Sequence, residues 1–214
     1  MATRSFVNKN EVSEFEAFFS QSLEQLQQHG HSWSWLMQRL SFHLEHHLIQ
    51  KLQIIPGRDK VQIISLGSWS RSELCPKSDI DVILLGNEDS VFSFVSLTEK
   101  QGVFLKYRTP EDKKDWTVGV KDFDLLALTK ARSIDDEAKS ELEQQKVKLQ
   151  ESAKNENLAK HWVDIMYAER IARNERYDSL ANYLEPNLKF GPGGLRDAEQ
   201  TSVAIRLHLS LIHI

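Results

Sequence analysis

The most informative stretch of this sequence runs from residue 67 to residue 81 and reads Gly67-Ser68-Trp69-Ser70-Arg71-Ser72-Glu73-Leu74-Cys75-Pro76-Lys77-Ser78-Asp79-Ile80-Asp81. A β-branched run at 61–66 precedes it, and an apolar run at 80–85 continues from its end. Runs of this length and composition, bounded by turn-forming residues such as Gly67 and Gly86, are typical of strands. The sequence therefore predicts two strands that are separated by a polar connection.

Periodicity extends this core in both directions. Before residue 55, apolar residues recur at steps of three and four, which predicts two helices, the second over 32–52. After residue 86 we expect a helix over 90–100, a strand over 103–107, and one or two strands within 117–128. Strands that alternate with helices indicate an α/β or α+β sheet domain.

The C-terminal part of the chain is predicted to be helical. Residues 135–156 are dense in charged side chains, and we interpret them as an exposed helix or linking arm. A loop at 187–194 leads into a helix whose apolar end has no capping residue, which we interpret as a sign of truncation. The domain prediction is N-terminal helices in 1–54, the sheet core in 55–132 and a helical region in 133–214.

Composition narrows the classes of protein. The chain has 214 residues with 27 Lys and Arg, 31 Asp and Glu, and a formal net charge of −4, so we expect no nucleic-acid partner. It has no apolar run of about 18 residues, so no membrane span is predicted. The start of the chain lacks a hydrophobic signal core, and the single cysteine excludes a disulfide framework. We expect a globular protein of the cytoplasm.

The connection after the first strand has the composition of a phosphate-binding turn. Gly67 and Ser68 are small, so their backbone N–H groups can approach a phosphate closely. Arg71 lies one turn further along and can bind the same anion with two hydrogen bonds. Gly67, Ser68 and Arg71 are therefore candidate nucleotide-binding residues.

The second strand begins with a pair of acids. Asp79 and Asp81 are two positions apart, so their side chains project to the same side of a strand. Two neighbouring carboxylates repel each other unless a cation neutralises them. Mg²⁺ prefers carboxylate and phosphate oxygens, which makes Mg²⁺, or Mn²⁺, the expected ion. Together with the turn, these acids predict nucleotidyl or phosphoryl transfer.

The order Gly-Ser, a spacer of ten residues and Asp-x-Asp resembles the nucleotidyltransferase motif of the polymerase-beta-like superfamily. The fuller pattern in 67–81, Gly-Ser-x-x-Arg-x-Glu-Leu-x-Pro-x-Ser-Asp-Ile-Asp, is similar to that of the PII-protein uridylyltransferase family. A second string in 184–197, Glu-Pro-Asn-x-Lys followed by Pro-Gly-Gly-Leu-Arg-Asp, also resembles that family. The resemblance implies an α+β fold, in which a polymerase-beta-like nucleotidyltransferase core with a mixed sheet in 55–132 has flanking helices and is followed by a partial helical domain.

The resemblance also implies an activity. Members of the family use UTP and Mg²⁺ to attach UMP to a tyrosine hydroxyl of a PII protein in nitrogen regulation, and pyrophosphate leaves. It implies that Asp79 and Asp81 bind metal and catalyse, while Gly67, Ser68, Arg71 and Ser78 bind nucleotide. Lys189, in the second string, is a further candidate for nucleotide binding.

Members of the superfamily usually supply a third carboxylate from a later strand. At the position that the resemblance assigns to this acid, the chain has Lys130. Asp124 lies in an apolar run nearby and is our substitute candidate for the catalytic and metal-binding role, with Asp122 as second choice. Loss of the third acid leaves open a catalytically inactive module that binds nucleotide and regulates. A nucleotidyltransferase that acts on a small molecule is a third possibility.

Two further sets of residues are interpreted as structural. Arg170, Arg173 and Arg176 form a partly shared basic helix face, and we expect them at the surface. Trp33 is expected to pack in the core or between helices.

Overall fold

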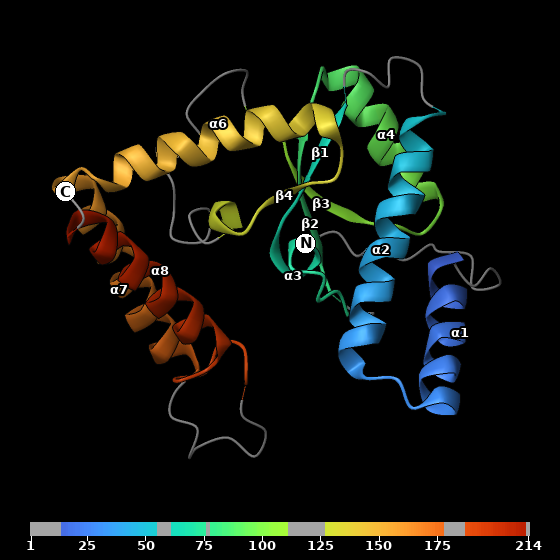
Figure 1. The fold of residues 1–214 in the computed structure, drawn as a ribbon, viewed down its shortest axis with the longest axis horizontal. Helices are drawn as coiled ribbons and strands as arrows, with labels where there is room; N and C mark the ends of the chain where they lie inside the picture. Colours follow the sequence, from blue (N-terminus) through green and yellow to red (C-terminus); the bar gives the residue numbers. More distant parts are fainter. Residues whose placement is uncertain (1–13, 55–60, 76–77, 111–126, 178–186, 213–214) are drawn as a thin grey trace. The chain divides into compact units, whose positions relative to one another are not determined.

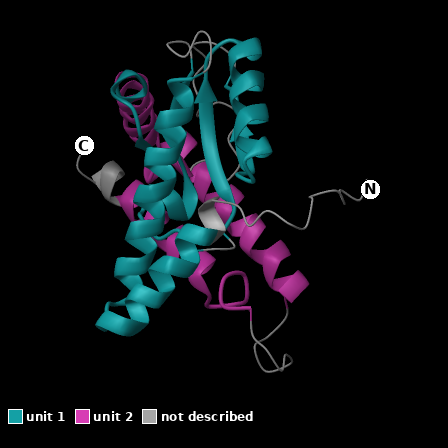
Figure 2. Cartoon of the chain, turned by 90° about the vertical axis from the view of Figure 1, so that its right-hand side faces the viewer, with its two compact units in different colours: residues 1–110, 131–139 teal, residues 111–130, 140–214 magenta. Residues whose placement is uncertain are grey.

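The computed structural model describes residues 14–54, 61–75, 78–110, 127–177 and 187–212 (Figure 1). The chain divides into two compact units, which are treated separately (Figure 2). The first unit comprises Met1–Pro110 and Ala131–Lys139, and the second comprises Glu111–Lys130 and Ser140–Ile214.

The described part of the first unit begins with two helices, as predicted. Helix α1 spans Glu14–His29 and helix α2 spans Trp33–Leu52. Ser32 caps α2, because its side-chain oxygen accepts a hydrogen bond from the Trp35 N–H. The buried leucines of α2 recur at every fourth residue and so form one apolar face: Leu36, Leu40, Leu44, Leu48 and Leu52.

Among the described residues, a four-stranded sheet follows in the order β3-β2-β1-β4. Its strands are β1 (Gln62–Ser65), β2 (Ile80–Leu85), β3 (Leu105–Arg108) and β4 (Arg132–Ser133). Strand β1 is antiparallel to β2 and to β4, whereas β2 and β3 are parallel. The parallel pair needs a crossover, which helix α4 (Glu88–Lys100) supplies. The mixed sheet and its helices confirm the α+β fold class.

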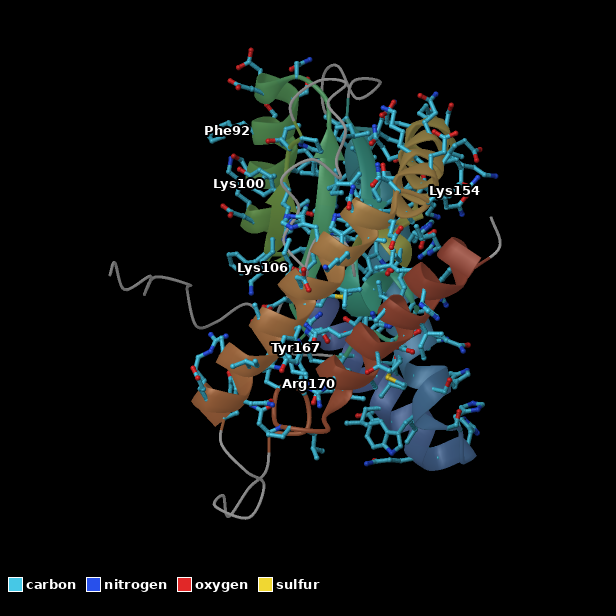
Figure 3. The ribbon with its side chains drawn as sticks, turned by 90° about the vertical axis from the view of Figure 1, so that its left-hand side faces the viewer. Phe92, Lys100, Lys106, Lys154, Tyr167 and Arg170 are labelled. Atoms are coloured by element: carbon cyan, nitrogen blue, oxygen red, sulfur yellow. The ribbon has the colours of Figure 1, made fainter. Side chains whose placement is uncertain are left out.

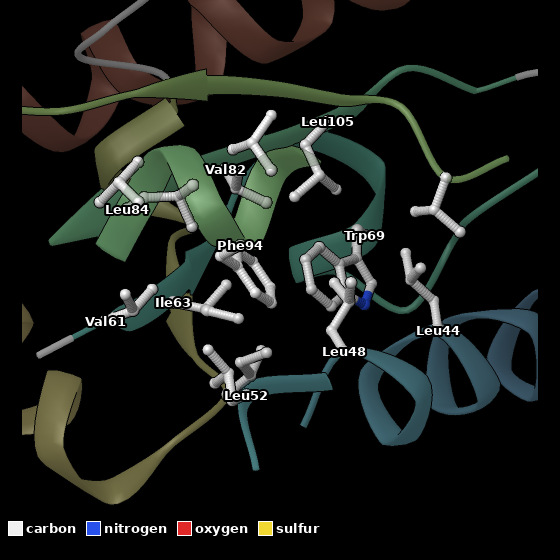
Figure 4. Packing of buried hydrophobic residues seen from close by; sticks show 14 of the residues in the cluster. Leu44, Leu48, Leu52, Val61, Ile63, Trp69, Val82, Leu84, Phe94 and Leu105 are labelled. Carbon is white, nitrogen blue, oxygen red and sulfur yellow. The ribbon is translucent and has the colours of Figure 1, made fainter. Parts of the chain in front are cut away.

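The core of this unit lies between α2, the sheet and α4. Side chains from all three converge there, including Leu48, Val82 and Phe94 (Figure 4). Trp69, from the four-residue helix α3 (Gly67–Ser70), is fully buried among them. Its indole N–H donates to the backbone carbonyl of Ser41 on α2, at 3.2 Å. The turn after β1 is therefore fastened to the core by its own side chain.

The edge strand β4 is fixed by polar contacts. The Ser65 hydroxyl donates to the Arg132 carbonyl at 2.8 Å. The Asp135 carboxylate accepts from the Ile63 N–H of β1 and from the Ala138 N–H in the first turn of the next helix. One side chain thus joins the sheet to the start of that helix.

In the part of the chain after β4 that the structure describes, three long helices follow: α6 (Asp136–Ala153), α7 (Glu156–Tyr177) and α8 (Leu195–Ile212). The interpretation of 135–156 as an exposed arm is wrong for one side of α6. Five of its residues are buried at spacings of three and four: Ala138, Leu142, Gln145, Leu149 and Ala153. A narrow apolar stripe is enough to bury a helix whose other faces are charged.

Several other expectations differ from the structure or lie outside it. Most of the predicted strand region 117–128 falls outside the described residues, and its described end, 127–128, is helical. Trp33 is not a core residue, because it is 65 % exposed at the start of α2. Within the described part of the chain, no helix combines the length and apolar character needed to cross a membrane.

Replacing Trp69 by alanine should destabilise the first unit. Loss of a fully buried indole typically costs about 3–5 kcal/mol of unfolding free energy. Urea denaturation followed by circular dichroism measures the change. Trp33→Ala is the matched control and should change the free energy by less than about 0.5 kcal/mol. Equal effects of the two substitutions would contradict the assignment of Trp69 to the core.

Candidate functional site

The turn after β1 and the acid at the start of β2 lie side by side. The Leu66 N–H donates to the Asp81 carbonyl at 2.9 Å, which continues the antiparallel pairing of β1 and β2. Gly67 follows with φ +58°, a backbone conformation that favours glycine. A Cβ atom at Gly67 would lie 3.1 Å from Asp81 Oδ2. The Asp81 carboxylate therefore faces the backbone of the turn.

Asp79 and Asp81 share a basic neighbour on the adjacent strand. Lys106 Nζ lies 2.6 Å from Asp79 Oδ2, and Lys106 is the register partner of Asp81 in the parallel pairing of β2 and β3. The hydrogen bond to Asp79 raises the pKa of Lys106, against a lowering by desolvation, and the charges of Asp79 and Asp81 raise it further. Both carboxylates thus act on one ammonium group.

The predicted phosphate-binding side chains also stabilise the loop itself. Arg71 Nη1 donates to the Gly67 carbonyl at 2.9 Å, and its Nε donates to Glu73 Oε2 at 2.7 Å. The Ser68 carbonyl accepts from the N–H groups of Arg71 and Glu73. These bonds fix the shape of the turn. As at any helix start, the first amide groups of the turn have no acceptors within the helix.

Ser78 closes the second half of the loop. Its N–H donates to the Cys75 carbonyl at 2.9 Å, and its hydroxyl accepts from the Cys75 N–H at 3.1 Å. This paired arrangement holds the residue directly before Asp79. The structure therefore gives Ser78 a positioning role, and its predicted contact with nucleotide stays a prediction.

Ser41 is a structural contributor to the loop that the sequence analysis missed. Its hydroxyl accepts from the Leu74 N–H, and its carbonyl accepts from the Trp69 indole. A serine within an amphipathic helix gives no local signal of such a role, because both partners come from another element.

The side chains near the turn provide only part of the ligand set that a divalent ion needs. Asp79 and Asp81 are carboxylates, the ligands that Mg²⁺ prefers, and both lie close to a cationic group already. The described residues contain no cluster of three or more histidine, cysteine or acidic side chains able to hold a metal. The third candidate acid, Asp124, and the second choice, Asp122, lie outside the described residues. Lys130 lies in a turn after a short helical segment, half-buried, and its replacement of the acid stays a prediction.

The second motif forms a compact loop at the start of α8. Asn187 Oδ1 accepts from the N–H groups of Lys189 and Phe190, and the Leu188 carbonyl accepts from the Leu195 N–H. A Cβ atom at Gly194 would lie 2.7 Å from the Leu188 carbonyl oxygen, so only glycine fits there. Local backbone structure thus explains Asn187 and Gly194 of the motif.

Lys189 belongs to the second unit. Its Nζ lies 5.1 Å from the centroid of the Phe190 ring, and that ring stacks on Tyr177 with centroids 5.7 Å apart. These contacts give Lys189 a local partner. Its predicted role in nucleotide binding stays a prediction.

Asp197 connects the loop to α7. One carboxylate oxygen accepts from the Gly193 N–H at 2.8 Å, and the other accepts from Arg173. Arg173 also donates to Gln200 at 2.8 Å and is 1 % exposed. The expectation that Arg173 lies at the surface is therefore wrong. A buried guanidinium needs acidic and amide acceptors, and α8 supplies both.

Comparison with known proteins adds independent information. Residues 162–213 match the family model described as GlnD PII-uridylyltransferase. The chain is 28 % identical over 155 residues to the bifunctional uridylyltransferase/uridylyl-removing enzyme of Erythrobacter litoralis, covering 66 % of this chain and 16 % of the relative. The enzyme of the same name from Idiomarina loihiensis is 27 % identical over 167 residues, covering 70 % of this chain and 18 % of the relative.

The chain resembles the PII-uridylyltransferase family. The chain spans less than a fifth of the length of these two relatives. The family-model match covers α8 and most of α7, the helices that Arg173 and Asp197 join. The described residues of the second motif, 187–197, lie within the matched region, where Asp197 joins the loop to Arg173 of α7.

Gly67→Ala should disturb the carboxylate of Asp81. An alanine in the left-handed region costs about 1–2 kcal/mol, and its methyl group would crowd Asp81 Oδ2. Gly30→Ala is the matched control, because Gly30 has φ +66° but nothing within 4 Å of an added Cβ. Only Gly67→Ala should shift the ¹³C NMR signal of the Asp81 carboxyl group. An unshifted signal would contradict the close approach.

Asp197→Asn should destabilise the second unit at neutral pH. Burial raises the pKa of Asp197, but the Gly193 N–H, Arg173 and Arg170 together hold it below its ordinary value of 3.8. A lowered folded-state pKa gives stability above the unfolded value that is lost as the pH falls through the folded one. We expect a loss of about 2 kcal/mol at pH 7 that shrinks below pH 3.8.

Thermal unfolding followed by circular dichroism at several pH values measures this effect. Asp164→Asn, at an exposed position of α7, is the control and should leave the unfolding free energy nearly unchanged. A loss for Asp197→Asn that stays constant into strong acid would show that the carboxylate charge is not the cause.

Proposed function

We propose that this chain carries a nucleotidyltransferase site that moves a nucleoside monophosphate onto a hydroxyl group and releases pyrophosphate. The observation that supports it most is the contact between the turn and the acid: the Asp81 carboxylate faces the backbone at Gly67. A turn whose backbone can approach phosphates, next to an acid that can bind a divalent ion, fits nucleotidyl transfer. The names of the relatives support the uridylyl group as the one transferred.

The proposed roles follow the positions of the residues. The small residues Gly67 and Ser68 let the turn approach the β- and γ-phosphates, and Arg71 provides positive charge beside them. Asp79 and Asp81 would hold Mg²⁺ or Mn²⁺, with Asp124 as the third proposed ligand. A bound divalent ion supplies neutralisation of the triphosphate and a lower pKa of the attacking hydroxyl.

The chemical step is a displacement at the α-phosphorus. The acceptor oxygen forms a bond to the α-phosphorus while the bond from that phosphorus to the bridging oxygen breaks. Pyrophosphate leaves with the electron pair of the broken bond, and the proton of the acceptor hydroxyl passes to water. Orientation of the phosphates by the turn is the contribution that this chain's backbone makes.

UTP is the proposed donor, and a tyrosine hydroxyl of a PII-like signalling protein is the proposed acceptor, in the cytoplasm. The names of the relatives support the uridylyl donor, and the description of the family model supports a PII-like partner. Ser78 and Lys189 remain proposed contacts to the nucleotide. If the acceptor is instead a small hydroxylated molecule, mass spectrometry would show the mass increase on that molecule and not on the protein.

A second candidate function is a module that binds nucleotide without turnover. The contact between Lys106 and Asp79 favours it, because a basic side chain on the strand next to β2 stands beside the acids. This candidate predicts binding of UTP with no release of pyrophosphate.

Replacing Asp81 by asparagine tests the proposed function. The chain, incubated with UTP, Mg²⁺ and a PII-like acceptor, should release pyrophosphate, and Asp81→Asn should lower the rate about a hundredfold or more. Asp89→Asn, at an exposed position of α4, is the control and should keep the rate. Unchanged turnover in Asp81→Asn would contradict the proposal, whereas UTP binding without any turnover would favour the second candidate.

A further inference from the structure

Lys106 has the placement of a counter-ion for the acid pair. It follows Leu105, whose side chain is buried in the core, so alternation along β3 directs Lys106 to the opposite face of the sheet. In the parallel register, Lys106 is the partner of Asp81, and Leu105 is the partner of Ile80. The packing of β3 therefore fixes the side of the sheet on which this ammonium group lies.

That face is the one on which the two acids lie. Val82 packs into the core, so its neighbour Asp81 projects to the other side, and Asp79 shares the parity of Asp81. The 2.6 Å contact between Lys106 and Asp79 is the direct evidence of proximity. The influence of both carboxylates on the pKa of Lys106 agrees with it.

The contact is accessible to solvent. The side chains of Lys106 and Asp79 are 63 % and 58 % exposed. Figure 3 labels the side chain of Lys106. An exposed ion pair is weak and exchanges readily with solvent and ions. An ion from solution can therefore replace the ammonium group without any change in the core.

We propose that Lys106 is a built-in counter-ion of Asp79 and Asp81, which a divalent cation must displace, so that Lys106 lowers the affinity of the site for metal. This inference rests on the proposed function, because it takes the acid pair to be the metal site. It extends that function by naming a residue that sets the metal concentration at which the site is occupied.

The expected size of the effect follows from charge alone. Binding of a divalent cation breaks the ion pair between Lys106 and Asp79. The bound cation is then repelled by the nearby ammonium group. For solvent-exposed groups, these two contributions together amount to about a tenfold change in affinity. The effect should decrease as the salt concentration rises, because exposed charges are screened.

The test is direct binding of Mn²⁺ to the full chain without nucleotide, measured from the electron paramagnetic resonance signal of free Mn²⁺. Lys106→Met should bind Mn²⁺ about tenfold more tightly than the unmodified chain. Lys106→Arg keeps the charge and should keep the weaker binding. Lys100→Met, at the exposed end of α4, is the control and should have no effect.

The outcomes separate this inference from the proposed function. Equal or weaker Mn²⁺ binding by Lys106→Met would overturn the counter-ion role while leaving the site's activity to its own assay. Absence of binding in every variant would also overturn it, since removal of a competing charge should expose the site. Tighter binding by Lys106→Met with no release of pyrophosphate would support the inference and count against catalysis. Circular dichroism of each variant confirms that the fold is kept.

Discussion

The antiparallel pairing of β1 with β2 is the constraint on which the candidate site depends. It places the end of β1 opposite the beginning of β2, so that the Leu66 N–H reaches the Asp81 carbonyl. The next residue, Gly67, then starts a turn directly against the side chain of Asp81. Because side chains alternate in a strand, a shift of one residue in this pairing would move both acids to the core face. The buried partners Ile63 and Leu84 prevent that shift.

The two motifs of the chain solve different physical problems. The first, in 67–81, leaves its carboxylates at a surface where they can meet ions. The second, in 184–197, uses its carboxylate internally, since Asp197 holds both a loop amide and the buried Arg173. Similar residue types thus have different uses, and burial decides between them. A buried carboxylate that is paired with a guanidinium does not bind ions from solution, whereas an exposed carboxylate can.

Local patterns were sufficient to predict most elements of the first unit. The helix α2 carries clear periodicity, and the strands β1 and β2 are apolar runs bounded by turn residues. The shared face of Asp79 and Asp81 follows from strand geometry alone. Strand β4 could not be predicted from the sequence, because a strand of two residues shows no periodicity. Only its pairing with Ile64 and Ser65 of β1 identifies it as a strand. The burial of Arg173 likewise depends on partners in another helix, which no property of α7 reveals.

The role of Lys106 shows what the sequence lacked at the site. A strand over 103–107 was predicted, and the parity of Lys106 relative to the buried Leu105 was available from it. The missing information was that β3 lies next to β2, parallel to it and in this register. Contacts between strands separated by a whole helix depend on topology, and residue spacing does not encode that.

The burial of Trp69 has a consequence for how any anion would meet the turn. Its side chain lies in the core, and its indole and the neighbouring Leu74 amide are both held by Ser41 of α2. The backbone of this segment is therefore already ordered before a ligand arrives, and binding loses little conformational entropy. Preorganisation of this kind favours recognition by rigid shape over induced fit, and it ties the lifetime of the recognition surface to the lifetime of the folded core.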